Sequence, residues 1–507
     1  MKKFSKFIAL GVLLGLSLGL CSAAWAAKDT LTVGLTADAR SLDPHATNDA
    51  ASCNAMIQLY EPLLEVAQDK SLTPMLAESW EQVDPLTYKF QLRKGVKFHN
   101  GEEMKADDAI FSLHRMTNSV GVKLYGDLLD PDGFEKIDDY TFTLKTRTPM
   151  VMYLPQLCHS SAYIMNKKYV EEAGEDYGDH PIGTGPFKFV SAVKNERTVM
   201  ERFDDYWGEK AKAKTLIFRI IPEANSRVVE LETGNVDLIN FVPFNEVKRL
   251  RTENKVDVSV HPGMGTLYFG LNCQMKPFDD PRVRKAISMG IDKQAIVDAV
   301  FEGLAAVPVI PLLPKHLYYP DNLPAFVHDP EGAKKLLAEA EFPKDYKMEI
   351  YTNDLKERID TATILQEQIT ELGINCEVQI LEWGAFLERL GSGNLSTFIS
   401  LWGSLDINPD PDSYVAGAFH SKNAGPSNRT WLKDDKVDEL LDLGRVTPDG
   451  PEREKIYLDL CDRINEIGGW LYIARPDVLY GVGKNVKGAD LYLSGGHASR
   501  MYQIYAE

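Results

Sequence analysis

Residues 76–108, LAESWEQVDPLTYKFQLRKGVKFHNGEEMKADD, carry the clearest local pattern in this chain of 507 residues. Tyr88, Phe90 and Leu92 alternate with polar side chains, which is the period-2 pattern of a half-buried strand. The Lys94-Gly95 pair ends this strand, the alternation resumes over residues 96–98, and a second turn at residues 100–101 tolerates positive φ. Acidic residues then open a helix that we predict over residues 106–116.

The N-terminus predicts export from the cytoplasm. Three lysines at positions 2, 3 and 6 precede an apolar run from Phe7 to Leu20, and Ala24-Trp25-Ala26 offers small residues to a signal peptidase. The apolar run is too short for a membrane-spanning helix, which needs about 20 residues. We therefore expect residues 1–26 to be a signal peptide, and the mature protein to be periplasmic with no membrane insertion.

Cysteine usage indicates neither a metal site nor a redox motif. Cys21 follows Leu20, where lipoprotein signals have a small residue, so lipid anchoring is disfavoured. Five cysteines remain after cleavage, and no Cys-x-x-Cys spacing occurs among them. Small buried side chains are the favoured interpretation, and one long-range disulfide stays possible.

Composition and motifs exclude several functions. The formal charge is −18, and about −21 without the signal peptide, which argues against nucleic acid or anionic membranes as partners. The chain lacks the zinc-protease, nucleophile-elbow and phosphate-loop motifs, so we predict no enzyme activity and no cofactor. Its ten histidines include no pair at i, i+4 with an acid between, so no metal site is predicted. The glycine-rich residues 183–186 end in Pro186, which has no N–H for a phosphate.

Strand and helix patterns alternate along the chain, which favours an α/β fold. A chain with 44% apolar residues is long enough for about two or three packed domains. The predicted strands are residues 30–35, 214–221, 236–241, 347–352 and 375–381, and the predicted helices are residues 51–60, 224–233 and 361–372. The expected boundary between two lobes lies near residues 266–272, with a second crossing near residues 477–483.

Many short blocks of this sequence, in order, resemble the bacterial extracellular solute-binding proteins of family 5, the dipeptide, oligopeptide and nickel receptors of ABC importers. The blocks are Ser41-Leu42-Asp43-Pro44, Tyr60-Glu61-Pro62-Leu63, residues 76–108, residues 181–187, Asp205-Tyr206-Trp207, Asn272 with residues 277–280 and 283–286, Asp292-Lys293, Asp329-Pro330 with Ala333, Trp383, and residues 410–414.

The resemblance implies a two-lobed periplasmic binding protein with two hinge strands and an extra subdomain inserted in the first lobe. We accordingly expect lobe I over residues 27–270, with the inserted subdomain at about 71–180. Lobe II would span residues 271–480, and residues 481–507 would return to lobe I. Such receptors are expected to be monomers.

The resemblance also suggests the ligand contacts. Asp406 best matches the acid that pairs with a peptide's α-ammonium, but extra residues after Trp402 leave Asp410 and Asp412 as substitutes, and loop capping explains those two equally well. Arg358 matches the contact to the C-terminal carboxylate, although Glu357 and Asp360 offer it a local ion pair.

The remaining candidates would line the pocket. Trp383 and Trp402 are expected to wall it, with core packing as the alternative. Cys53 and Thr184 are further candidates, although the Thr184 segment also suits a tight turn.

The expected function is capture of a small solute, closure of the lobes, and delivery to the transmembrane subunits of an ABC permease. Short peptides, dipeptides above all, are the favoured ligand because Asp406 and Arg358 would hold both termini. A nickel chelate, oligosaccharide, opine or glutathione-like compound stays open as cargo, since fold does not determine ligand. An exported hydrolase is disfavoured because no nucleophile or metal group was found.

Overall fold

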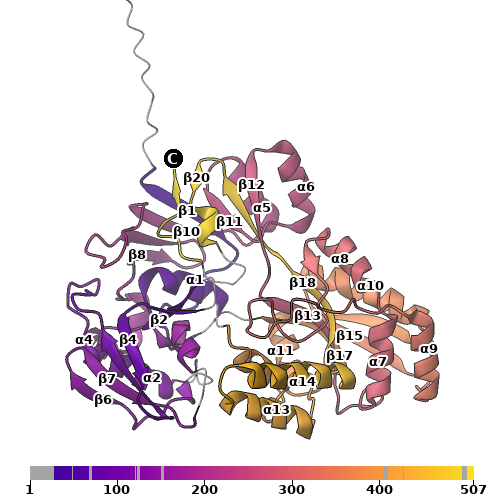
Figure 1. Cartoon of the computed structure of the whole chain (residues 1–507). Helices are drawn as coiled ribbons and strands as arrows, with labels where there is room; N and C mark the ends of the chain where they lie inside the picture. The colour runs from indigo at the N-terminus through magenta and orange to yellow at the C-terminus, as the bar shows by residue number, and fades with distance from the viewer. Residues whose placement is uncertain are drawn as a thin grey trace, which may run out of the picture.

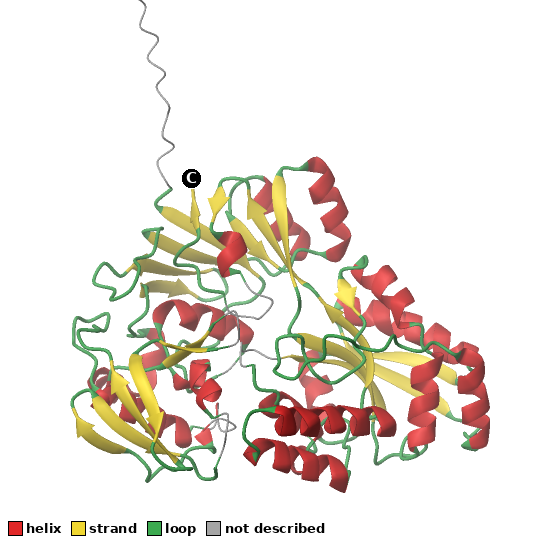
Figure 2. Ribbon diagram, in the orientation of Figure 1, coloured by secondary structure: helices red, strands yellow, loops and turns green. Residues whose placement is uncertain are grey.

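The computed structural model describes residues 28–47, 49–67, 71–119, 122, 126–149, 153–403, 409–425, 427–493 and 499–507. The predicted signal peptide and Asp406 lie outside these residues. Strands and helices alternate and gather around two large sheets, which confirms the α/β class (Figures 1 and 2). None of the helices in this described part is long and apolar enough to cross a membrane.

Lobe I, as we use the term, is built around a seven-stranded sheet of order β12-β19-β11-β1-β10-β9-β8. Its central strand β1 pairs in parallel with β10 and β11, and β19 pairs antiparallel with β11 and β12. The strands are β1 (Thr30–Leu35), β8 (Phe187–Val193), β9 (Arg197–Arg202), β10 (Thr215–Ile220), β11 (Leu238–Asn240), β12 (Val256–His261) and β19 (Val478–Gly483).

Helices cover both faces of this sheet. On one face, Met56 and Leu59 of α1 (Ala50–Leu59) share a core with Leu31 and Val33 of β1. On the other face, α5 (Ala224–Glu232) and α6 (Phe244–Glu253) pack against β11, β12 and β19. A short helix, α15 (Ala489–Tyr492), follows the β19 strand.

The stretch 76–108 belongs to a separate four-stranded antiparallel sheet of order β4-β5-β7-β6, seen beside α2 in Figure 1. Tyr88 and Phe90 of β5 point into its core together with Leu113 of α2. Residues 96–98 form only a bridge at Lys97 and Glu103 rather than a strand. The elements of this subdomain are β4 (Ala77–Gln82), β5 (Thr87–Leu92), α2 (Ala106–Thr117), β6 (Glu135–Asp138) and β7 (Thr141–Lys145), flanked by β2 (Leu64–Val66), β3 (Leu72–Pro74) and α4 (Lys167–Ala173).

Lobe II is built around a six-stranded sheet of order β14-β18-β13-β17-β15-β16. The strands β15, β16 and β17 are parallel, whereas β13 runs antiparallel to both of its neighbours. The strands are β13 (Gly265–Leu271), β14 (Ala305–Ala306), β15 (Lys347–Asn353), β16 (Asn375–Leu381), β17 (Thr397–Gly403) and β18 (Leu471–Pro476).

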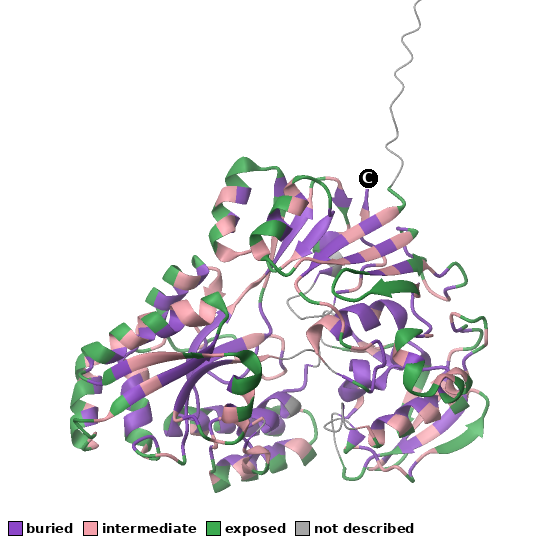
Figure 3. Ribbon diagram, turned by 180° about the vertical axis from the view of Figure 1, so that it is seen from behind, coloured by how far each residue is buried: buried purple, intermediate pink, exposed green. Residues whose placement is uncertain are grey.

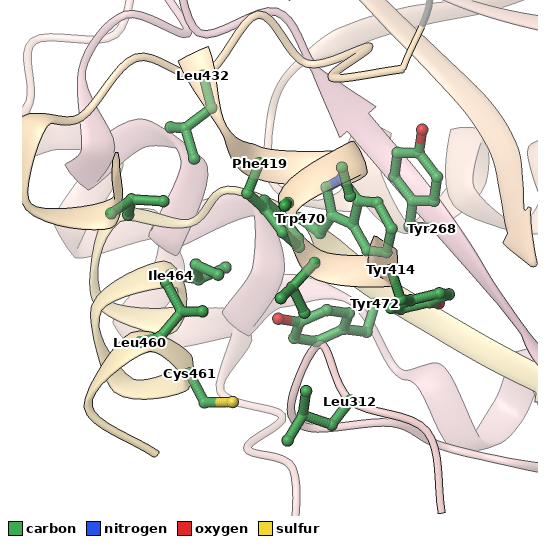
Figure 4. Close-up of a cluster of buried hydrophobic side chains, with 14 of the residues drawn as sticks. Tyr268, Leu312, Tyr414, Phe419, Leu432, Leu460, Cys461, Ile464, Trp470 and Tyr472 are labelled. Atoms are coloured by element: carbon green, nitrogen blue, oxygen red, sulfur yellow. The ribbon is translucent and has the colours of Figure 1, made fainter. Parts of the chain in front are cut away.

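Two hydrophobic cores flank this sheet, and Figure 3 shows its buried strands in purple. The first core faces α7 (Pro281–Gly290), α8 (Lys293–Phe301), α9 (Pro330–Glu339) and α10 (Lys356–Glu371). The second faces α11 (Trp383–Gly391), α12 (Asp412–Phe419), α13 (Asp435–Val446) and α14 (Pro451–Ile467). In the second core, the Tyr268 ring stacks on Trp470 with centroids 4.1 Å apart (Figure 4).

The chain crosses between the two large sheets twice. Residues 262–264 join β12 to β13, and Asp477 joins β18 to β19. The crossings touch, because a Cβ added at Gly263 would lie 1.9 Å from the Pro476 carbonyl oxygen. After β19 the chain stays with lobe I, where β20 (Val486–Lys487) pairs with β21 (Tyr505–Ala506) and the Lys28 N–H donates to the Ala506 carbonyl at 2.8 Å.

Candidate ligand-binding site

Each large sheet has parallel strands, and α/β proteins bind ligands at the carboxyl ends of such strands. In lobe I, Leu35 ends β1 and Asn240 ends β11. In lobe II, Asn353 ends β15, and Trp402 is the penultimate residue of β17. These two sets of strand ends are therefore the places to look for ligand-binding side chains.

The lobe I strand ends border a small cavity. Leu35, Asn54, Asn240, Tyr480 and Ser499 are among the residues that line it. The Asn240 Oδ1 atom is buried and accepts no hydrogen bond from the described residues. A buried acceptor without a donor is costly, so this atom suits a ligand N–H or a bound water. Only its position, as a polar residue at the end of an apolar strand, marks Asn240 in the sequence.

Arg358 lies in the first turn of α10, just beyond the carboxyl end of β15. Its Nη1 donates to Asn353 Oδ1 at 2.8 Å, and its guanidinium carbon lies 5.5 Å from the centroid of the Trp383 ring. The local ion pair considered from the sequence does not form, because Asp360 pairs with Lys356 instead. Among the described residues, no carboxylate lies within ion-pair distance of Arg358, so its positive charge is held only by a neutral amide and an aromatic ring.

A second arginine lies close to Arg358. The Arg429 Nη1 donates to Ser400 Oγ at 2.7 Å, and its guanidinium carbon lies 5.6 Å from the centroid of the Trp402 ring. Burial first, and the positive charge of Arg429 second, lower the pKa of Arg358 to about 10. Burial raises the pKa of the Tyr268 hydroxyl, and the positive charges of Arg429 and Arg358 oppose that rise. Sequence reasoning missed Arg429, because no pattern in the loop that carries it points to a strand end.

The two tryptophans border this arginine pair. Trp383 is 42% exposed and stacks on Phe386, with ring centroids 5.9 Å apart. Trp402 is half-buried, and its Nε1 donates to the Tyr414 carbonyl at 3.1 Å. Core packing alone therefore does not describe Trp383, whereas Trp402 has both a core contact and an arginine contact.

Asp410 and Asp412, the substitutes for Asp406, are both engaged in ion pairs. Asp410 is buried and accepts two hydrogen bonds from Arg453, at 2.8 and 3.1 Å. Asp412 Oδ2 accepts from Arg445 Nε and Nη2, both at 3.1 Å. These pairs join the start of α12 to α13 and α14, which is a structural role for both acids.

Thr184 and Cys53 are buried inside lobe I, and neither lines the cavity beside Asn240. The Thr184 hydroxyl donates to Glu61 Oε2 at 2.9 Å, and Tyr206 and Trp207 donate to the same carboxylate at 2.6 and 2.7 Å. The Cys53 Sγ lies 3.3 Å from the Ser160 hydroxyl. These contacts hold the lobe together.

The turn that carries Thr184 is held by the opening stretch. His99 Nε2 donates to the Gly185 carbonyl at 3.1 Å, and its Nδ1 accepts from the Gly183 N–H at 3.2 Å. A Cβ at Gly183 would lie 2.1 Å from the Leu59 carbonyl oxygen, so this turn requires glycine for close packing.

Two other features bear on cofactors. No group of three or more His, Cys, Asp or Glu side chains suited to a metal ion occurs in the described ranges. The five cysteines of the predicted mature chain are all thiols, and four of them are buried.

Comparisons with known proteins identify the fold. A model of the bacterial extracellular solute-binding proteins, family 5 (middle region), matches residues 71–426. The chain belongs to this family. Members are receptors without enzyme activity that bind small solutes outside the cytoplasm, so the chain is a solute-binding protein of an ABC transporter and not an enzyme.

Three similar proteins cover almost the whole chain. The dipeptide-binding protein of Escherichia coli K12 is 30% identical over 87% of this chain and 87% of its own length. The glutathione-binding protein GsiB of Pectobacterium atrosepticum is 28% identical over 92% of this chain and 93% of its own. The periplasmic binding protein DppA of Helicobacter pylori, solved with the peptide STSA, superposes with a TM-score of 0.83 at 28% identity, covering 94% of this chain and 98% of that one. These matches confirm the periplasmic binding protein fold.

Proposed function

We propose that this receptor captures short peptides, dipeptides above all, and delivers them to the membrane permease of an ABC importer. The observation that carries the proposal is the geometry of Arg358. Its guanidinium stands at the carboxyl end of β15, oriented by Asn353 and Trp383, without a carboxylate partner among the described residues. A peptide's C-terminal carboxylate matches the fork of N–H donors that arginine presents.

The proposal requires contacts from both lobes. Lobe II offers the guanidinium of Arg358, whereas lobe I offers Asn240 Oδ1, an acceptor to which no described residue donates. Asp406 stays the proposed partner of the α-ammonium group. A ligand that touches both lobes only when they are closed shifts the open–closed equilibrium toward the closed state, by as much as its affinity differs between the two states.

The test is calorimetric titration of the purified protein with a panel of dipeptides. We expect measurable binding by the wild type, and a loss of about 30-fold or more in Arg358→Ala, because truncating one partner of a buried charge pair costs about 2–5 kcal/mol. Arg282→Ala is the matched control, since Arg282 is exposed on α7 and pairs with Asp280. Equal affinities for the wild type and Arg358→Ala would refute this role of Arg358.

Glutathione is a second candidate, favoured by the similarity over 92% of this chain to a protein named as glutathione-binding. Glutathione is itself a small peptide with free carboxylates, so the same arginine would hold it. Titration with reduced glutathione beside the dipeptide panel separates the two, because the preferred cargo binds at the lower concentration and displaces the other.

A further inference from the structure

Arg475, the penultimate residue of β18, is a buried cation to which no described residue offers a hydrogen-bond acceptor. The residue is 8% exposed, and its Nη1 atom is buried without a partner. Its guanidinium carbon lies 6.0 Å from the centroid of the Tyr319 ring, and no carboxylate of the described residues lies within ion-pair distance. Buried polar atoms are nearly always hydrogen-bonded, and a buried charge without a partner is costly. These facts indicate that an anion binds beside Arg475.

Asp477 compensates this charge only from a distance. Burial raises the pKa of Asp477, and the positive charge of Arg475 opposes that rise. The two residues flank Pro476, and among the described side chains no ion pair joins them. Asp477 therefore lowers the cost of the buried charge without using the N–H donors of Arg475.

Arg475 lies in one cross-strand row with Trp402, a residue of the candidate ligand site. Thr266 of β13 is paired with Trp402 of β17, and Leu267 is paired with Ala474 of β18. Continuing the second register by one residue places Thr266 beside Arg475. Directly opposed residues of antiparallel strands point to the same sheet face, so Arg475, Thr266 and Trp402 share a face.

Tyr414 supports this placement from the helix that covers the row. Its hydroxyl donates to the Trp402 carbonyl at 3.1 Å and to Thr266 Oγ1 at 3.3 Å. Burial raises the pKa of Tyr414, and the positive charge of Arg475 opposes that rise. Arg475 therefore lies close to the end of β17, where the ligand site was located above.

Arg475 and Arg358 lie at separate positions in lobe II. Arg358 is anchored to Asn353 of β15, and β15 lies three strands from β18 in the sheet (Figure 1). At about 4.8 Å between neighbouring strands, the two backbones are about 14 Å apart. The charges that shift the pKa of Arg358 do not include that of Arg475. Two separate anionic groups of a ligand are therefore needed to pair with both arginines.

We propose that Arg475 is a second anion-binding residue of the ligand site, and that it selects short peptides whose N-terminal residue is Asp or Glu. The C-terminal carboxylate pairs with Arg358, and the side-chain carboxylate pairs with Arg475. In a dipeptide, an acidic side chain well separated from the C-terminal carboxylate belongs to the first residue. This inference rests on the proposed function, because it assumes that the cargo is a peptide. Its new element is the specificity-determining role of Arg475.

The test compares two dipeptides of equal shape, Glu-Ala and Gln-Ala, by calorimetric titration of the wild type and of Arg475→Gln at pH 7. We expect the wild type to prefer Glu-Ala by about tenfold or more, which corresponds to one charge-assisted hydrogen bond. Arg475→Gln removes this preference and leaves the affinity for Gln-Ala within about threefold. Arg475→Lys retains part of the preference, because it keeps the charge and loses the fork geometry. Arg282→Gln is the control and leaves both affinities unchanged.

Three results overturn the inference alone. These are equal binding of the two peptides by the wild type, a preference that persists in Arg475→Gln, and an equal loss for both peptides in Arg475→Gln. If the wild type binds both peptides equally, and chloride raises its unfolding temperature but not that of Arg475→Gln, the anion beside Arg475 is inorganic. Failure of the wild type to bind any peptide of the panel overturns the proposed function, and this inference falls with it. Thermal unfolding of each variant in the same buffer verifies that a lost preference is not a loss of folding.

Discussion

Arg453 and Asp410 form a two-point ion pair inside lobe II, with Nη1–Oδ2 and Nη2–Oδ1 distances of 2.8 and 3.1 Å and both side chains 1% exposed. Removing one partner leaves the other charge buried and unpaired, which costs about 3–5 kcal/mol. We therefore expect Asp410→Ala to lower the free energy of unfolding by about this amount, as measured by denaturant titration. The exposed pair Lys89–Glu81 is the control, and Glu81→Ala should cost under about 1 kcal/mol. Equal, small effects of both variants would contradict the structural role of Asp410.

Lys293 predicts a pH dependence at the alkaline end. Burial lowers its pKa to about 8, and in the described part of the chain its Nζ contacts the Ser288 hydroxyl, at 3.5 Å, and the Phe326 ring. The unfolded chain binds more protons at this residue between pH 8 and about 10.4, so its contribution makes stability rise with pH across that window. Below pH 8 the buried charge costs at most about 3 kcal/mol.

The variant Lys293→Met should remove both the cost of the buried charge and the rise in stability with pH that Lys293 contributes. We expect a higher unfolding free energy at pH 7, and between pH 8 and 10 an unfolding free energy that rises less with pH than in the wild type. Lys335→Met is the control, because Lys335 is 81% exposed and should change neither quantity by more than about 0.5 kcal/mol. If the unfolding free energy changes with pH at the same rate in the wild type and in Lys293→Met between pH 8 and 10, the account is contradicted.

Gly263 predicts a steric limit at the crossing between the lobes. Its missing Cβ leaves room for the Pro476 carbonyl, which would otherwise lie 1.9 Å away. Gly263→Ala must push the two crossing segments apart, and we expect a cost of about 1–3 kcal/mol in thermal or denaturant unfolding. Gly391→Ala is the matched control, since its added Cβ at the end of α11 meets no described atom within 4 Å apart from its chain neighbours and its own helix backbone. If both variants unfold at the wild-type midpoint, the crossings are not in close contact.

Two roles can be tested for Thr184: support of lobe I through its hydrogen bond to Glu61, and contact with the ligand. Its hydroxyl donates to the buried Glu61, so Thr184→Ala should cost about 1–3 kcal/mol of stability, while Thr184→Ser should keep most of it. If Thr184 only supports lobe I, peptide affinity in Thr184→Ala stays within about threefold of the wild type at a temperature where the variant is folded. A loss of affinity without a loss of stability would instead indicate a ligand contact.

Local patterns predicted much of the secondary structure. The strands expected over residues 30–35 and 375–381 have those bounds in β1 and β16. The helix expected from Thr361 begins five residues earlier, at Lys356, because Leu355 offers no capping side chain that would mark the start. The strand expected over residues 236–241 contains only residues 238–240, since Phe241 adopts a φ of 52°.

The candidate site was less predictable, because its side chains meet through tertiary contacts. Arg358 and the two tryptophans followed from the family resemblance, and the structure places them at strand ends. Arg429 and Asn240 come from segments far from these in sequence, and only the pairing of β15 with β17 and of β1 with β11 shows where they lie. The ion pairs of Asp410 and Asp412 likewise depend on α13 and α14, which no motif connects to the start of α12.

Native mass spectrometry of the protein purified from a periplasmic extract tests the central claim most directly, because a co-purified cargo is weighed without prior choice of ligand. We expect the wild type to carry an added mass that fragments as a short peptide, and Arg358→Ala, purified in parallel, to carry little of it. A bound metal chelate, opine or sugar, or a peptide retained equally by Arg358→Ala, would contradict the account.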